Sequence, residues 1–359
     1  MIIIDAHEDI AFNVLVDGRN YLQSAYLTRT AENGTTVPES TGICMLGLPE
    51  WIQARVAVIF ATLTTIPRGH ARPGEMSYGN IEASYQQALA QLAIYRRWSE
   101  TTAAIRLITD QSHLNAVLAS WEHEEVAPQT GLALLMENAD SIRTPEEIGF
   151  WYEQGLRIVG PAWHTNRFTG STMDAGPLTA AGRALLAAMG HFGMALDLSH
   201  MAEEACLEAL ATYPGPILAS HANPRRMAPI ARLLSDKVIA EIIARDGVIG
   251  IMPVSWALVP NWRQKPRAEI GIDLVAQAID IVCQIAGDAH HVGLGTDFDG
   301  GQGAECAPAG IETVADLPLI AVALEQRGYA SADIEAILHG NWLRILRQTL
   351  PSEPSVALT

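Results

Sequence analysis

The sequence has few cysteines, few clustered basic residues and no long apolar run. Cys44, Cys206, Cys283 and Cys306 are scattered and form no Cys-x-x-Cys pair, a pattern typical of a reduced, cytoplasmic protein. The 40 acidic residues outnumber the 23 basic residues and give a net charge of −17. Nucleic acid and anionic membranes are therefore poor partners.

The longest apolar runs, such as 56–63, are of strand length and fall short of the ~20 residues that a membrane-spanning helix needs. The chain enters its first apolar strand at Ile2 without a charged leader or a cleavage site, so we expect no secretory leader and no membrane anchor. With 359 residues, 49% of them hydrophobic, the chain can form one barrel-sized domain or two smaller ones. We expect one domain over residues 1–350 and a flexible tail over 351–359.

Apolar segments of strand length alternate with helical patterns along the chain. The expected strands lie at 2–4, 56–61, 131–136, 156–159, 194–198, 216–219, 248–252 and 291–295. Apolar spacing and capping residues predict helices at 82–98, from a capping box at Thr144 to Gly155, from about 179, from Ser235 to Gly247, at 314–326 and at 331–348. Segments 17–42 and 66–79 have turn chemistry without sustained periodicity, so we expect loops there.

Eight strands alternating with helices predict a (β/α)8 barrel of the TIM type, with a doubly wound open sheet as the rival fold. Polar residues follow the carboxyl ends of the predicted strands, and they are His7, Asp9, Glu137, His164, His200, His221 and Asp297. In a parallel barrel those ends meet at one mouth, whereas an open sheet would spread them along a line. The open sheet is also disfavoured because no Gly-x-Gly-x-x-Gly follows the first strand.

His7 and Asp9 are the starting point for the chemistry. In an extended chain residues i and i+2 point the same way, so both side chains are expected to leave the first strand on one face, as two ligands for a divalent ion. Taken singly, each candidate has an alternative explanation as a structural residue, namely a turn residue, a helix cap or a buried polar group. Three histidines and two carboxylates at the ends of four strands make five ligands, which is more than a single catalytic zinc binds. Two ions that share one carboxylate would use all five.

We therefore expect His7 and Asp9 on one ion, His200 and His221 on the other, and Glu137 between them. Water bridging two such ions becomes hydroxide near neutral pH and is a hydrolase's nucleophile. Asp297 then acts as the proton shuttle to the leaving group, with a sixth ligand or a turn residue as its alternatives.

The sequence resembles the renal (membrane) dipeptidase family of zinc peptidases, within the amidohydrolase superfamily. The likeness covers nearly the whole chain, through the segments 5–9 (DAHED), 136–138 (MEN), 163–166 (WHTN), 178–182 (LTAAG), 196–200 (LDLSH), 219–221 (ASH), 291–300 (HVGLGTDFDG) and 340–344 (GNWLR). The resemblance implies a dipeptidase with two zinc ions, for which manganese or cobalt are possible substitutes, held by the same five residues. It also implies a homodimer.

The resemblance implies two further roles. His164 corresponds to a histidine that contacts the substrate and helps to hold the developing oxyanion. Arg232 corresponds to the arginine that binds the dipeptide's free carboxylate, although Arg225 and Arg226 lie nearer to His221 in the chain. Segments 166–171 and 253–266 depart from the animal pattern, so the preferred dipeptides, including those with a C-terminal D-residue, stay open.

Two alternatives to a dipeptidase remain. The same metals could hydrolyse an N-acyl amino acid or a cyclic amide, and Arg232 is the discriminating feature, because a free α-carboxylate needs such a partner and a neutral substrate does not. A binding or scaffold protein without catalysis is disfavoured, because all five expected ligands and Asp297 are present.

Overall fold

The strands form one closed parallel barrel in this computed structural model, which describes residues 1–72, 75–123 and 125–352. The described strands are β1 Ile3–Glu8, β2 Val56–Thr64, β3 Ile105–Ile108, β4 Thr130–Glu137, β5 Leu156–Gly160, β6 Ala195–Asp197, β7 Ile217–Ala219, β8 Val248–Ile251 and β9 Val292–Leu294. They are ordered β2-β1-β9-β8-β7-β6-β5-β4-β3, and a parallel pairing of β2 with β4 closes the ring. The short β3 pairs beside the first half of β4, and β5 pairs beside its second half. The barrel predicted from the sequence is confirmed, because eight of the nine described strands, all except β3, form the closed ring, and these are the eight expected.

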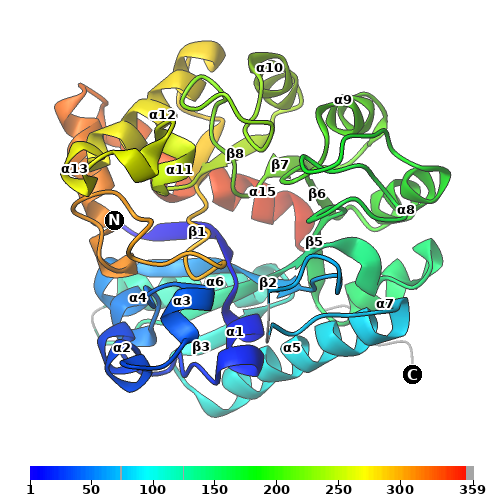
Figure 1. Ribbon diagram of the computed structural model, residues 1–359, viewed down its shortest axis with the longest axis horizontal. Helices are drawn as coiled ribbons and strands as arrows, with labels where there is room; N and C mark the ends of the chain where they lie inside the picture. Colours follow the sequence, from blue (N-terminus) through cyan, green and yellow to red (C-terminus); the bar gives the residue numbers. More distant parts are fainter. Residues whose placement is uncertain (73–74, 124, 353–359) are drawn as a thin grey trace.

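Helices surround this barrel, and α15 passes across the centre of the view in Figure 1. The α-helices are α1 Ile10–Asp17, α2 Ala25–Glu32, α3 Val37–Thr41, α4 Leu48–Ala54, α5 Ile81–Thr101, α6 Gln111–Glu122, α7 Ile148–Glu153, α8 Ala180–His191, α9 Glu203–Thr212, α10 Asp236–Ala244, α11 Ser255–Leu258, α12 Ile272–Ala286, α13 Pro318–Gln326, α14 Ser331–Glu335 and α15 Asn341–Thr349. Short 3-10 turns lie at Ala139–Ser141, Pro145–Glu147, Trp262–Gln264, Arg267–Glu269 and Val314–Asp316, and a π-turn at Ala336–Gly340 joins α14 to α15.

Two predicted caps are present in the structure. The hydroxyl of Thr179 accepts the backbone N–H of Gly182 at the start of α8. The hydroxyl of Ser235 accepts the N–H of Val238 at the start of α10. The prediction of a capping box at Thr144 is wrong. A 3-10 turn begins after this residue, and no hydrogen bond to the Thr144 side chain caps the turn.

The prediction of a loop over 17–42 is also wrong. The segment contains α2, capped by the hydroxyl of Ser24, and α3, which has a proline in its first turn. Both helices are at most eight residues long, too short to display a sustained apolar period. Strand β3 was not predicted either, because only Ile105 and Ile108 of its four residues are buried. Helix α6, which follows it, was also not predicted.

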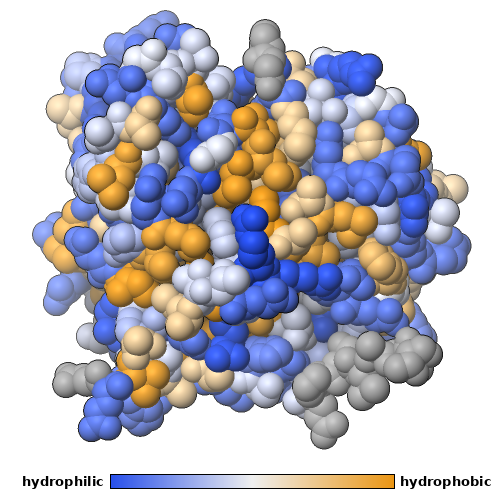
Figure 2. All heavy atoms as spheres, turned by 90° about the horizontal axis from the view of Figure 1, so that it is seen from below, coloured by the Kyte–Doolittle hydropathy of each residue, from blue (hydrophilic) through white to orange (hydrophobic). Residues whose placement is uncertain are grey.

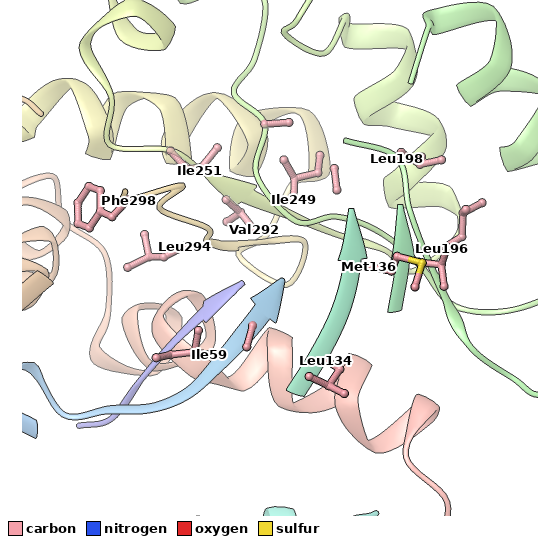
Figure 3. Packing of buried hydrophobic residues seen from close by; sticks show 14 of the residues in the cluster. Ile59, Leu134, Met136, Leu196, Leu198, Ile249, Ile251, Val292, Leu294 and Phe298 are labelled. Carbon is pink, nitrogen blue, oxygen red and sulfur yellow. The ribbon is translucent and has the colours of Figure 1, made fainter. Parts of the chain in front are cut away.

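Alternate residues of the same strands belong to two apolar clusters. The larger cluster contains Leu134 and Met136 of β4 together with side chains of most surrounding helices, and Figure 3 shows part of it, including these two residues. The second cluster contains Ala133 and Leu135 of β4 and also Trp342 of α15. Because successive strand residues point to opposite faces, the two clusters lie on opposite sides of the barrel wall.

The surface is mixed, with several apolar patches between hydrophilic side chains on the face seen in Figure 2. Among the residues that the structure describes, no helix combines the length and apolar character needed to cross a bilayer. Most of the predicted tail, residues 353–359, lies outside the described residues. The prediction of a single domain over 1–350 stays a prediction.

Candidate metal centre

Glu137 lies at the centre of a group of three histidines. It is the last residue of β4, and its Oε1 lies 3.7 Å from Nε2 of His7, 3.1 Å from Nε2 of His200 and 3.5 Å from Nε2 of His221. His200 and His221 follow the ends of β6 and β7, and their Nε2 atoms are 3.0 Å apart. The barrel thus brings together side chains that are far apart in the sequence.

His7 and Asp9 also converge, although the chain is not a regular strand there. The register of β1 against β2 shifts between Asp5 and Glu8, and such irregularities re-aim side chains beside active sites. Asp9 lies beyond the strand and precedes the first residue of α1. Its Oδ1 is 3.9 Å from Nε2 of His7 and accepts hydrogen bonds from the hydroxyls of Thr62 and Thr64.

The hydroxyl of Ser220 orients two of the imidazoles. It donates to Oδ2 of Asp197 at 2.5 Å, and it lies 2.7 Å from Nδ1 of His221 and 3.2 Å from Nδ1 of His7. A serine has one proton to donate, and Ser220 donates it to Asp197, so both imidazoles donate from Nδ1 to the serine oxygen. Their Nε2 lone pairs are then left facing Glu137.

This arrangement fits a divalent metal. Nε2 of His7 is buried and has no hydrogen-bond partner among the described residues. Ligand atoms at about 2.0–2.1 Å from a tetrahedral ion lie about 3.3 Å from one another, and the separations of 3.0, 3.1 and 3.5 Å among His200, His221 and Glu137 are close to that value. Imidazole nitrogen and carboxylate oxygen are ligands that suit zinc. His7 also belongs to two groups with metal-ligand spacing, one with Glu137 and His221 and one with Asp9 and Asp297.

Burial shifts the pKa values of three of these groups. It raises the pKa of Glu137 to about 8, because an apolar environment disfavours the carboxylate. It lowers the pKa values of His200 and His221 well below their usual range, and the positive charge of Arg232 lowers both further. His200 and His221 are therefore neutral at pH 7, which is the form that binds a metal.

Asp297 lies at the same mouth, in the loop that follows β9. Its backbone has a φ of +57°, and its N–H donates to the carbonyl of His7 at 3.1 Å. Burial raises the pKa of Asp297 well above its usual range, and the carboxylates of Asp9 and Glu137 raise it further. A Cβ atom at Gly300 would overlap Oδ1 of Asp297 and lie 2.9 Å from Oδ2 of Asp9, so the two carboxylates meet over this glycine.

A cavity of about 400 Å³ opens beside these groups. It is lined by four of them, Asp9, Glu137, His200 and Asp297, and also by three arginines and three tryptophans. Arg232 is one of these arginines, and its Nη2 donates to the carbonyl of His221 at 2.9 Å and lies 3.2 Å from Nε2 of His200.

The rivals of Arg232 are engaged elsewhere. Arg225 forms an ion pair with Glu203, and the exposed Arg226 pairs with Asp236.

His164 is placed differently from the other candidates. Its ring stacks on that of His70 with centroids 3.4 Å apart, and its Nδ1 lies 3.2 Å from the carbonyl of Thr165. Within the described residues it is not part of the cavity lining, where its neighbour Trp163 is found. The substrate contact expected for His164 therefore stays a prediction.

Sequence reasoning missed the groups that support the ligands. Asp197 and Ser220 stand inside the quoted LDLSH and ASH segments, yet no role was given to them. A signal was available, because a carboxylate or hydroxyl commonly fixes the tautomer of a metal-binding histidine. The contact itself joins β6 to β7 and is visible only after folding.

The comparisons with known proteins agree with this geometry. The family model described as membrane dipeptidase, peptidase family M19, matches residues 1–354. The chain belongs to this family. Among individual relatives, an uncharacterized protein from the pqqA 5′ region of Klebsiella pneumoniae is 32% identical over 206 residues, which are 55% of this chain and 73% of that protein. An uncharacterized dipeptidase of Schizosaccharomyces pombe is 27% identical over 276 residues, 76% of this chain and 64% of that protein.

Solved structures share the fold of this M19 member. A metallo peptidase from Rhodobacter sphaeroides, liganded with a phosphinate mimic of the dipeptide L-Ala-D-Ala, superposes with a TM-score of 0.78 at 23% identity. The match covers 97% of this chain and 99% of that chain. The probable dipeptidase PvdM from Pseudomonas aeruginosa gives a TM-score of 0.79 at 18% identity, covering 97% and 95% of the two chains.

Proposed function

We propose that this M19 protein is a metal-dependent dipeptidase that uses two divalent ions, with zinc as the first candidate. The observation that carries the proposal is the position of Glu137, whose Oε1 is within 3.7 Å of three imidazole nitrogens beside an arginine-lined cavity. Glu137 would be the shared ligand, with His7 and Asp9 holding one ion and His200 and His221 holding the other. When bound, such ions polarise the scissile carbonyl and acidify the attacking water.

The remaining steps belong to side chains of this chain. Arg232 binds the free carboxylate of the dipeptide, since it lines the cavity and its Nη1 is buried without a partner in the described residues. Asp297 takes the proton of the attacking water and passes it to the leaving amine, which balances the hydrolysis. Burial raises the pKa of Asp297, and a raised pKa makes a carboxylate a better proton acceptor, as the first half of this transfer requires. His164 would need to turn from His70 toward the cavity to hold the oxyanion.

A substrate panel tests this function. The assay compares L-Ala-L-Ala and L-Ala-D-Ala with L-Ala-L-Ala amide, an N-acetyl amino acid and a cyclic amide, each with zinc, manganese and cobalt. L-Ala-D-Ala is included because the Rhodobacter structure holds a mimic of it. Metal-dependent turnover of the free dipeptides supports the proposal, whereas turnover of the acyl amino acid or cyclic amide alone would favour the other amidohydrolase reaction.

Arg232→Gln sharpens the assignment. We expect KM for L-Ala-L-Ala to rise at least about tenfold, because the guanidinium that binds the carboxylate is lost. Turnover of the amide, which lacks the carboxylate, should change little. The matched control is Arg226→Gln, an exposed arginine paired with Asp236, which should leave both values unchanged. A normal KM for the Arg232 variant would refute the role of this residue.

A further inference from the structure

We propose that Gln302 is a positioning residue that fixes the carboxylate of Asp297 for proton transfer, and that Trp256 holds Gln302 in place. The proposal rests on the dipeptidase function above and adds to it two residues outside the expected ligands. Both residues line the same cavity as Asp297. Trp256 lies in the segment between β8 and α12.

Two short hydrogen bonds connect the three side chains. The indole Nε1 of Trp256 donates to Oε1 of Gln302 at 2.5 Å, and Nε2 of Gln302 donates to Oδ2 of Asp297 at 2.6 Å. An indole N–H can only donate, so it holds the amide oxygen of Gln302 toward Trp256 and leaves the amide N–H to donate to Oδ2 of Asp297. Gln302 is only 8% exposed, and hydrogen bonds shielded from water are stronger and more directional.

The two oxygens of Asp297 then have different surroundings. Oδ2 is bound by the amide of Gln302. Oδ1 lies over Gly300, at the point where a Cβ atom would also approach Oδ2 of Asp9. The amide therefore sets the rotation of the carboxyl group and leaves Oδ1 on the side of the expected metal ligands. A proton acceptor must lie within hydrogen-bond reach of the group it serves, so this rotation matters for turnover.

Trp256 is suited to anchor the bridge. It belongs to α11, which follows β8, and it packs on a small apolar cluster that contains Leu233, Met252 and Val254. The backbone N–H of Ser255 donates to the carbonyl of Cys306 at 2.8 Å, which ties this helix to the loop that carries Gln302. The packing on the apolar cluster and the backbone hydrogen bond of Ser255 thus both restrict the position of the indole.

Gln302→Met tests the proposal, because methionine has a similar length and makes neither bond. The variant is assayed with its metals restored, and kcat, KM, metal content and unfolding temperature are measured. We expect kcat to fall about 10- to 100-fold while KM stays within about threefold, since orientation of a catalytic group contributes on that scale. Metal content and unfolding temperature should be close to those of the unchanged protein. Gln264→Met, which changes an exposed glutamine in the segment that contains Trp256, is the matched control and should retain normal kcat.

Two further variants separate positioning from other roles. Trp256→Phe keeps an aromatic ring and removes the N–H donor, so kcat should fall by less than in Gln302→Met. The double variant should lose no more kcat than Gln302→Met alone. In an Asp297→Asn background, Gln302→Met should lower the residual kcat less than twofold, because the carboxylate that the amide serves is gone.

Several results would overturn the proposal. An increase in KM with normal kcat would make Gln302 a substrate contact. An equal loss of kcat with and without Asp297, or a loss that follows metal content or unfolding temperature, would make it a structural residue. If the wild-type protein cleaves dipeptides, a normal kcat in Gln302→Met would refute the positioning role alone. If the wild-type protein cleaves no dipeptide, the dipeptidase function is refuted as well.

Discussion

Replacing Ser220 by alanine removes the one hydroxyl that lies between Asp197 and two imidazoles. The oxygen is 2.5 Å from Oδ2 of Asp197, 2.7 Å from Nδ1 of His221 and 3.2 Å from Nδ1 of His7. Without this hydroxyl, no other group among the described residues accepts a hydrogen bond from Nδ1 of His7 or His221. Each ring then loses the contact that keeps its Nε2 lone pair toward Glu137. Loss of such a supporting contact weakens metal binding about 10- to 100-fold, or about 1.4–2.7 kcal/mol.

Competition with a chromophoric chelator measures this affinity at fixed pH. The control is Ser84→Ala, which removes a buried hydroxyl that is hydrogen-bonded to Thr65 and Ser141 at 2.9 Å each and is not among the expected metal ligands or their partners. Both variants lose hydrogen bonds of a buried group and should unfold more easily, by about 1–3 kcal/mol for each group left unsatisfied. Metal affinity should fall only for Ser220→Ala. Wild-type affinity in that variant would refute the tautomer argument.

Three other changes have defined outcomes. Gly300→Ala places a carbon against Oδ1 of Asp297 and 2.9 Å from Oδ2 of Asp9, so we expect kcat to fall at least about 100-fold with a nearly unchanged unfolding temperature, and normal kcat would contradict the crowding. Because the pKa of Glu137 is raised to about 8, its carboxyl is protonated below that pH; metal uptake between about pH 5 and 8 should therefore release its proton and weaken as pH falls. Calorimetry in buffers of different ionisation enthalpy measures that proton, which Glu137→Gln should abolish. Trp342→Ala empties a fully buried site in α15 and should lower the free energy of unfolding by about 3–5 kcal/mol, whereas a loss below about 1 kcal/mol in urea titration would show that the helix does not support the barrel.

The barrel and the positions of the candidate ligands were predictable because both follow from local patterns. Each barrel strand is a short apolar run, and Glu137, His200 and His221 stand at or just after the ends of three such runs. Parallel topology then brings strand ends to one mouth without any knowledge of the contacts. Helices such as α2 escaped prediction because two turns carry too few apolar residues to establish a period.

The supporting contacts were not predictable for a different reason. Ser220 reaches Asp197, and Trp256 reaches Gln302, across 23 and 46 residues of sequence. Contacts of this kind depend on the register of neighbouring strands and on the path of the loops above them.

Metal depletion and titration decide whether the cluster around Glu137 is a catalytic metal centre. The protein is dialysed against a chelator, and L-Ala-L-Ala hydrolysis is followed as zinc is returned in known amounts. We expect hydrolysis to disappear on depletion and to recover to a plateau at about two ions per chain, with no recovery in a His200→Ala/His221→Ala variant. Full hydrolysis by protein that holds fewer than about 0.1 ions per chain would contradict the metal centre.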